Sequence, residues 1–384
     1  MNNFTYSIPT KIHFGKDQIS HLNELKESGD KVLLVYGGGS IKKSGIYDNA
    51  MEILKSADIT VYELSGVEPN PKIESVRAGV STCKENEIDM VLAIGGGSTI
   101  DCAKVVAAGA CSEEDPWELV LHPDRIKKAL PIYSVLTLAA TGSEMDEFAV
   151  ISDLSKNEKW GTASELLKPT MSIMDPQYTY TVSPKQTSAG TADIISHTFE
   201  NYFTNVKGAD VQARFAEGLL KNCFKYGPIA LKEPDNYDAR ANLMWTSSMA
   251  INGLIKDGAE VAWCVHPMEH ELSAFYDITH GEGLAILTPV WMDFALSDKT
   301  AGKFAEYGRN VWNIVGEDDM VVAKEAIAKT REFFAQMNLP KTLAEVGINE
   351  EYFDKMAEKA ANGCAGSFVE LTKEDIIEIY KAAL

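Results

Sequence analysis

Residues 93–104 have the sequence AIGGGSTIDCAK, and this stretch decides the fold class of the N-terminal half. Three consecutive glycines, Gly95 to Gly97, follow an apolar run and open a segment of helical character. Glycines let the backbone approach a phosphate without a Cβ atom in the way, and the amino end of a helix offers free N–H groups. The stretch therefore predicts a phosphate-binding turn between a strand and a helix. It is not the Gly-x-Gly-x-x-Gly fingerprint, so a tight turn with nothing bound stays open as the alternative.

A second glycine-rich turn, Gly37-Gly38-Gly39-Ser40, ends an earlier apolar run in the same way. Two such turns at the carboxyl ends of parallel strands favour a bound dinucleotide. This turn has no acidic residue for a ribose 2′-hydroxyl, and Lys42 and Lys43 follow it, so charge favours NADP(H) over NAD(H). The alternative is that both lysines are merely solvated.

Short apolar runs alternate with amphipathic stretches through the first half of the chain. They predict strands over residues 31–36, 59–64, 90–94 and 130–136, with helices over residues 42–56 and 72–87. Strands separated by helices of this length indicate a parallel sheet covered on both faces. We therefore expect an α/β dinucleotide-binding domain over residues 1–182.

Beyond residue 182 the spacing of apolar residues becomes helical. Ser183-Pro184 predicts an N-cap followed by proline at the first helical position, opening a helix that passes through Asp193 and His197. Further helices are predicted over residues 208–224, 237–255, 259–275, 302–315, 320–337, 350–360 and 373–383. We expect an all-helical metal-binding catalytic domain over residues 183–384, with a cleft between the two domains.

Length and composition agree with this division. A chain of 384 residues exceeds what one hydrophobic core usually supports. The net charge of −20 is spread along the chain and would repel a polyphosphate, so nucleic acid is not an expected partner. The six scattered cysteines form no Cys-x-x-Cys pair, which indicates reduced thiols. There is no signal peptide and no apolar run of about 18 residues, so we expect a cytoplasmic protein without membrane contact.

Four of the seven histidines fall between residues 197 and 280. Residues four apart share one face of a helix, so Asp193 could reach one ion together with His197, and His266 has the same spacing to His270. His280 is a fifth candidate ligand, and the spacing leaves open which four residues coordinate. Imidazole and carboxylate ligands without thiolate suit Fe²⁺ or Zn²⁺, and we expect Cys264 to be a buried structural thiol.

Together these features resemble the iron-containing (group III) alcohol dehydrogenase family, in particular its butanol dehydrogenase branch. The motifs that carry the resemblance are, in order, Phe14-Gly15, Gly95 to Lys104, Thr141-Gly142-Ser143-Glu144, Gly190-Thr191-Ala192-Asp193 and His266 to Gly281. The resemblance covers the whole chain and implies the dehydroquinate synthase-like fold, with an α/β nucleotide-binding domain followed by a helical metal-binding domain.

The resemblance also implies roles for individual residues. The metal ligands would be Asp193, His197, His266 and His280, and His270 would lie near the nicotinamide as a proton-handling or positioning residue. The implied nucleotide contacts are Gly38, Ser40, Asn70, Gly96, Gly97, Ser98, Asp101, Thr137, Thr141 and Lys159. Leu138 stands where many relatives carry a hydroxyl group, so one hydrogen bond to the nucleotide would be missing or supplied by Thr137.

We therefore expect a homodimeric enzyme that interconverts primary aliphatic alcohols and aldehydes by hydride transfer, with Fe²⁺ or Zn²⁺ and NADP(H) or NAD(H). A glycerol or other polyol dehydrogenase of the same fold is the nearest alternative. A dehydroquinate synthase would need more basic residues, and the apolar stretch 261–265 suits an aliphatic alcohol better. A metallohydrolase would have no use for two glycine turns, and a nucleotide sensor would not need the metal.

Overall fold

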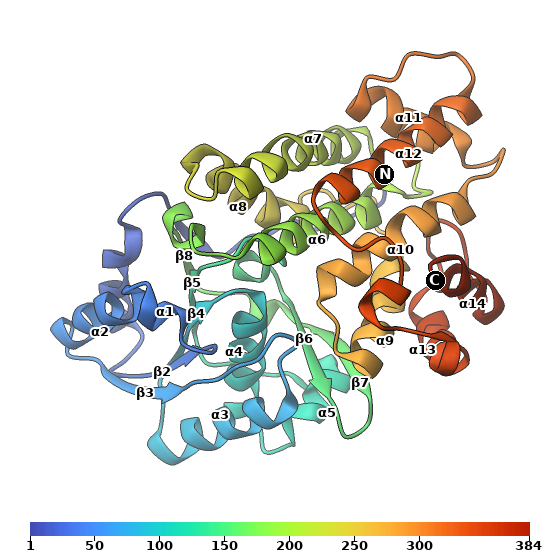
Figure 1. The fold of residues 1–384 in the computed structure, drawn as a ribbon. Coiled ribbons are helices and arrows are strands. Elements are labelled where there is room, and N and C mark those ends of the chain that lie inside the picture. Colours follow the sequence, from blue (N-terminus) through green and yellow to red (C-terminus); the bar gives the residue numbers. More distant parts are fainter. The chain divides into compact units, whose positions relative to one another are not determined.

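Six parallel strands form the centre of the N-terminal half of the computed structural model, which describes residues 1–384 (Figure 1). In spatial order they are β1 (Lys11–Phe14), β8 (Met171–Met174), β5 (Ile132–Leu136), β4 (Met90–Gly95), β2 (Lys31–Tyr36) and β3 (Thr60–Leu64). The strand order reverses between β2 and β4, which pair in parallel with Leu33 opposite Val91. Ligands of such sheets bind at the carboxyl ends of the strands on either side of this reversal, and both glycine-rich turns follow those ends.

Alternate residues of the central strands enter two different cores, because successive side chains of a strand point to opposite faces. Leu33 and Val91 pack on the face covered by α3 (Ile73–Asn86), α4 (Gly97–Ala110) and α5 (Pro116–Leu121). Leu34 and Leu92 pack on the other face, with the 3₁₀ helix η1 (Gln18–Glu27) and α2 (Ile46–Ser56). The predicted parallel sheet with helices on both faces is confirmed.

Several short elements of this half were not predicted. Strands β1 and β8, of four residues each, are two additional strands of the sheet, and α1 (Ser40–Lys43) is a single turn. Strands β6 (Phe148–Asp153) and β7 (Glu158–Ala163) form a separate antiparallel hairpin. With four residues each, β1, β8 and α1 are too short to display a period.

The C-terminal half consists of helices, as predicted. They are α6 (Pro184–Tyr202), α7 (Asp210–Lys232), α9 (Val265–Tyr276), α10 (His280–Ala295), α11 (Ala301–Trp312), α12 (Asp319–Gln336), α13 (Phe353–Gly363) and α14 (Lys373–Ala382). Helix α6 begins as expected, because the Ser183 side chain accepts a hydrogen bond from the Gln186 N–H and Pro184 occupies the first turn. Helix α9 begins at Val265 rather than at residue 259. No helix of the chain is both long enough and apolar enough to cross a membrane.

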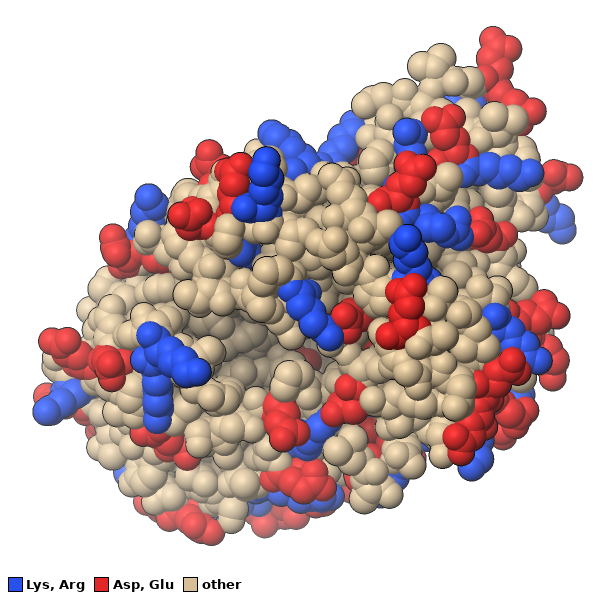
Figure 2. All heavy atoms as spheres, viewed as in Figure 1, with Lys and Arg blue, Asp and Glu red and all other residues tan.

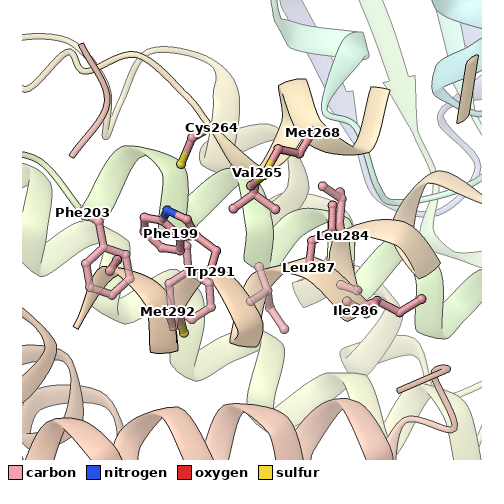
Figure 3. Close-up of a cluster of buried hydrophobic side chains, with 14 of the residues drawn as sticks. Phe199, Phe203, Cys264, Val265, Met268, Leu284, Ile286, Leu287, Trp291 and Met292 are labelled. Atoms are coloured by element: carbon pink, nitrogen blue, oxygen red, sulfur yellow. The ribbon is translucent and has the colours of Figure 1, made fainter. Parts of the chain in front are cut away.

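Helix α10 was absent from the prediction. Most of its side chains are buried, and it contains Pro289 in its interior. Figure 3 shows its side chains Leu284, Leu287 and Met292 in the core cluster with Phe199 of α6 and Met268 of α9. Between Gly283 and Met292 only Thr288 is polar, so the amphipathic period that identifies the other helices is missing.

The chain forms two compact units. The first, here called the α/β unit, comprises residues 7–182 and 234–248, and the second, the helical unit, comprises residues 1–6, 183–233 and 249–384. A single boundary after residue 182 does not describe these units, because residues 1–6 belong to the helical unit and residues 234–248 to the α/β unit. Most of α8 (Tyr237–Ile251) belongs to the α/β unit, where Met244 enters the core of the sheet. The N-terminal residues join the helical unit, where the Asn2 N–H donates to the Gly258 carbonyl at 2.9 Å. The division into domains 1–182 and 183–384 stays a prediction.

Candidate metal and nucleotide sites

Three helices of the helical unit bring histidines around one carboxylate. Asp193 and His197 lie one turn apart on α6, while His266 and His280 belong to the first turns of α9 and α10. Oδ1 of Asp193 lies 3.5 Å from Nε2 of His197 and 3.7 Å from Nε2 of both His266 and His280. The ligand atoms of Asp193, His266 and His280 all lie within 4.8 Å of one another. His197 adjoins this group and stacks on His266 with ring centroids 4.7 Å apart.

Several polar atoms of this cluster are buried without a hydrogen-bond partner. They include Oδ1 of Asp193 and Nε2 of His266, which face each other but make no hydrogen bond. Leaving such atoms unpaired costs free energy, whereas a cation accepts lone pairs from all of them at once. The donor set of imidazole nitrogens and one carboxylate oxygen suits Fe²⁺ or Zn²⁺. The residues present therefore fit a divalent metal.

The electrostatics of the cluster are set by burial and by mutual attraction. Burial lowers the pKa of His197 to about 4, which leaves its imidazole neutral and able to act as a ligand. Burial acts against the charged form of Asp193 too, but the three histidines together hold its pKa below the ordinary value. Burial likewise opposes protonation of His266, yet Asp193 and Glu200 raise its pKa to about 9. A metal must displace that proton, so binding is coupled to proton release.

Two buried carboxylates, which were not predicted from the sequence, contact the Nδ1 atoms of the His266 and His280 rings. Glu200 of α6 lies 3.2 Å from Nδ1 of His266 and accepts the backbone N–H of His266 at 2.8 Å. Glu269 of α9 pairs with Nδ1 of His280 and accepts a hydrogen bond from Ser273. A carboxylate on Nδ1 fixes the ring and leaves Nε2 to the metal. The signal was present in the spacing, since Asp193, His197 and Glu200 follow one another at helical intervals.

His270 and Trp263 border the histidine cluster. The His270 ring centroid lies 5.6 Å from that of His280 and 6.2 Å from that of His266. Its ligand atoms group with Glu269 and His280 rather than with Asp193. The Trp263 ring lies 4.8 Å from His266 and places an apolar surface beside the cluster. The buried Cys264 thiol has a pKa raised well above its usual value, mainly by burial, as suits a structural thiol.

The first glycine-rich turn joins β4 to α4 as predicted, and a neighbouring loop presses on it. A Cβ atom at Gly97 would lie 2.1 Å from Oγ1 of Thr141, and one at Gly96 would lie 3.2 Å from the side chain of Leu138. Thr137 donates its backbone N–H to the Gly95 carbonyl at 2.9 Å. The structure thus brings residues 95–98 into contact with residues 137–141, and both segments contain residues that are predicted to bind the nucleotide. The glycines are required by packing as well as by any phosphate.

Other residues predicted to contact the nucleotide have partners within the protein. Asp101 is buried in α4, where it accepts hydrogen bonds from Oγ of Ser143 at 2.6 Å and from the N–H of Val150 at 3.0 Å. Lys159 is buried in β7. Asn70 adopts a positive φ of 51° just before α3. The nucleotide contacts proposed for these three residues remain predictions.

The second glycine-rich turn follows β2, and Ser40 opens α1. A Cβ atom at Gly38 would meet nothing within 4 Å, so its backbone is accessible. Lys42 is not merely solvated, because its Nζ lies 3.7 Å from the Glu63 carboxylate and over the rings of Tyr36 and Tyr47. Residues 37–40 contain no acidic group for a ribose 2′-hydroxyl, but Glu63 of β3 places a carboxylate beside Lys42, which follows this turn. The charge argument for NADP(H) is weaker than the sequence alone suggested.

An α/β unit with glycine turns at a sheet reversal, together with an Asp/His cluster on buried helices, defines a metal-dependent dehydrogenase of the dinucleotide-binding class. Family models agree over nearly the whole chain. Residues 9–176 match the iron-containing alcohol dehydrogenase model, and residues 187–384 match the C-terminal model of the Fe-containing alcohol dehydrogenase family. The chain belongs to the iron-containing alcohol dehydrogenase family, as its motifs predicted.

Individual relatives extend over the full length. NADH-dependent butanol dehydrogenase A of Clostridium acetobutylicum is 55% identical over 386 residues, covering 99% of both chains. An NADPH-dependent aldehyde reductase of Escherichia coli is 42% identical over 91% of this chain and 90% of its own. The crystal structure of NADH-dependent butanol dehydrogenase A from Thermotoga maritima superposes with a TM-score of 0.95, at 39% identity, over 100% of this chain and 99% of that one.

Proposed function

We propose that this protein is a metal-dependent alcohol dehydrogenase and aldehyde reductase that interconverts primary aliphatic alcohols, butanol among them, and the corresponding aldehydes with NAD(P)(H). Family membership over nearly the whole chain supports the reaction class. The observation that carries the proposal is the convergence of three Nε2 atoms on the unpaired Oδ1 of Asp193. Relatives named as butanol dehydrogenases support the butanol-like substrate.

Asp193, His197, His266 and His280 are the proposed ligands of Fe²⁺, or of Zn²⁺ where that ion is more available. When bound, the ion supplies Lewis-acid chemistry to the oxygen of the alcohol or aldehyde. Glu200 and Glu269 keep the His266 and His280 rings oriented, and Trp263 offers the apolar surface that an aliphatic chain prefers. The glycine turns would hold the dinucleotide, which when bound would supply hydride chemistry.

His270 is proposed to handle a proton or to position the nicotinamide. Its imidazole lies one helical turn beyond His266, close to the proposed ligands but outside the group around Asp193. Oxidation of an alcohol releases the hydroxyl proton, and an imidazole exchanges protons near neutral pH. His270 is the histidine best placed to accept that proton.

The proposed reaction is tested by steady-state assays with butanol and butyraldehyde, each with NAD(H) and NADP(H), on protein loaded with Fe²⁺ or with Zn²⁺. We expect turnover of both substrates and none in an Asp193→Ala variant, which lacks a proposed ligand. Higher kcat/KM with glycerol than with butanol would replace the substrate by a polyol. An active Asp193→Ala variant without bound metal would overturn the mechanism.

The pair Lys42 and Glu63 is proposed to tune the choice between NADH and NADPH. Glu63→Gln removes the carboxylate beside Lys42, so we expect the ratio of kcat/KM for NADPH to that for NADH to rise severalfold. Glu52→Gln, which removes an exposed charge from α2, is the matched control and should leave the ratio unchanged. An equal rise in both variants would attribute the effect to net charge alone.

We further propose a homodimer, which the family resemblance implies, located in the cytoplasm, which the lack of a signal peptide and of a long apolar run favours. Light scattering on the purified protein and fractionation of cells test them, and a monomer or a secreted protein would contradict them.

A further inference from the structure

A second histidine cluster lies in the α/β unit and has no part in the proposed reaction. His13 belongs to β1, while His21 and Glu24 belong to η1. Oε1 of Glu24 lies 3.2 Å from Nε2 of His13 and 2.7 Å from Nδ1 of His21. Glu24 also binds Nζ of Lys11 through its other oxygen, Oε2, at 2.6 Å.

The local geometry explains why these side chains meet. Residues three apart are aligned in a 3₁₀ helix, so His21 and Glu24 project from the same side of η1. Residues two apart share one face of a strand, so Lys11 and His13 project together from β1. The His13 and His21 rings stack with centroids 3.5 Å apart and planes inclined by 10°. Two imidazoles and a carboxylate thus lie together on two adjacent elements, and one of the stacked rings would have to turn for both imidazoles to bind a single ion.

One of the two separations suits an ion, whereas the other is that of a hydrogen bond between His21 and Glu24. A tetrahedral ion bonded at about 2.1 Å to nitrogen and oxygen holds its ligand atoms about 3.4 Å apart. The distance of 3.2 Å between Nε2 of His13 and Oε1 of Glu24 is close to this value, and the three ligand atoms all lie within 4.8 Å of one another. The 2.7 Å hydrogen bond between Nδ1 of His21 and Glu24 would have to break, with the two atoms separating to about 3.4 Å.

His13 provides a second, independent observation. Its Nε2 atom is buried and has no hydrogen-bond partner, although it lies 3.2 Å from Oε1 of Glu24. Burial, together with nearby His21, lowers the pKa of His13, so the ring is neutral at physiological pH and has a lone pair to offer. A buried nitrogen without a partner costs free energy that a bound cation would recover. His21 is 38% exposed, so an ion can reach the cluster from solvent.

We propose that His13, His21 and Glu24 form a second metal site, which binds Zn²⁺ or a neighbouring first-row transition ion reversibly and ties β1 to η1. Two imidazoles and one carboxylate leave a fourth position for water, as zinc sites with three protein ligands do. The exposed ammonium of Lys11 stands beside Glu24 and opposes the ion, which keeps the site weaker than the buried cluster around Asp193.

The test measures metal stoichiometry by equilibrium dialysis of the zinc-loaded holoenzyme against buffered free Zn²⁺, with elemental analysis of the protein. We expect the wild type to bind one Zn²⁺ per chain more than His21→Ala or Glu24→Gln, while all three keep the same turnover of butanol. His122→Ala is the matched control, because His122 is also exposed and lies 3.9 Å from Glu118 one helical turn away. It should bind as much Zn²⁺ as the wild type.

Lys11→Ala provides a gain-of-affinity arm that misfolding cannot imitate. Removing the opposing ammonium should lower the Kd of the additional Zn²⁺ by roughly fivefold, the effect of one exposed charge close to the ion. The proposal is overturned if the wild type and His21→Ala bind equal amounts of Zn²⁺, or if His122→Ala loses as much as His21→Ala. It is also overturned if Lys11→Ala leaves the Kd unchanged.

Discussion

The chemistry of the histidine cluster depends on residues that never touch the metal. Glu200 spans the N–H groups of Cys264 and His266 and the ring of His266, so it fixes both the start of α9 and the orientation of one proposed ligand. We predict that Glu200→Gln lowers metal affinity by about 10- to 100-fold, because an amide binds Nδ1 more weakly than a carboxylate does. Competition with a chelator measures this affinity directly.

A matched control separates orientation of the ligand from general loss of packing. Glu217 of α7 is also buried, and it accepts hydrogen bonds from Tyr202 and Asn310. Glu217→Gln should disturb the helical unit to a comparable degree without changing metal affinity. Equal metal affinities of the Glu200→Gln variant and the wild type would show that Glu200 does not contribute to metal binding.

His270 separates binding of the metal from the reaction itself. We predict that His270→Ala retains the metal but lowers kcat, because the family resemblance implies a proton-handling or positioning residue rather than a ligand at this position. Metal analysis and steady-state kinetics on the same preparation check both halves of the prediction. Loss of metal from this variant would make His270 a ligand, for which Glu269 and His280 are the nearest partners.

At the scale of single residues, the sequence indicated the histidines but not their carboxylate partners. Histidine is rare in this chain, with seven copies, so four of them in one region stand out. Acidic residues number 56, and apart from the helical spacing of Glu200 to Asp193 and His197, nothing in the sequence distinguishes the buried Glu200 and Glu269 from solvated ones. Burial distinguishes them, and burial is a property of the fold.

At the scale of elements, the site depends on the close approach of α6 and α10. A Cβ atom at Gly281 would lie 2.0 Å from the carbonyl oxygen of Ala189, a backbone atom that cannot rotate away. We predict that Gly281→Ala pushes His280 away from Asp193, destabilises the protein by about 1–3 kcal/mol and lowers metal content. Denaturant titration and metal analysis measure the two effects.

Gly218→Ala is the control for this change, because a Cβ atom there meets nothing within 4 Å on an exposed position of α7. Alanine favours a helix over glycine by up to about 1 kcal/mol, so this variant should be more stable and keep its metal. Metal content at wild-type level in Gly281→Ala would show that the two helices can separate without opening the site.

The elements themselves were predictable where a period was visible. Strands β2 to β5 are short apolar runs between helices, and α6 has both an N-cap and a proline. Helix α10 was missed because its residues 283–292 are apolar on almost every side, and β1 and β8 because four residues show no pattern. In these cases the element is determined by the neighbouring structure that buries it, and a local sequence pattern does not report that structure.

At the scale of the whole molecule, charged side chains are interspersed, whereas the buried apolar residues form separate hydrophobic cores. Acidic and basic side chains are interspersed over the face shown in Figure 2, in keeping with a net charge of −20 that is not concentrated in one tail. The cores are separate, since the large cluster of the helical unit shares no residue with the two clusters of the sheet. All proposed metal ligands belong to the helical unit, and both glycine turns belong to the α/β unit.

Metal and cofactor should therefore protect different parts of the chain. We predict that chelation of the iron-loaded protein accelerates amide hydrogen exchange in α6, α9 and α10 and leaves β2 and β4 unchanged, because a ligand stabilises the elements that hold it. NADH or NADPH should instead slow exchange in residues 37–43 and 95–100. Asp193→Ala should exchange like the chelated protein and no longer respond to chelator. Acceleration spread equally over the strands would mean that the metal stabilises the molecule as one cooperative unit, against the separation of its cores.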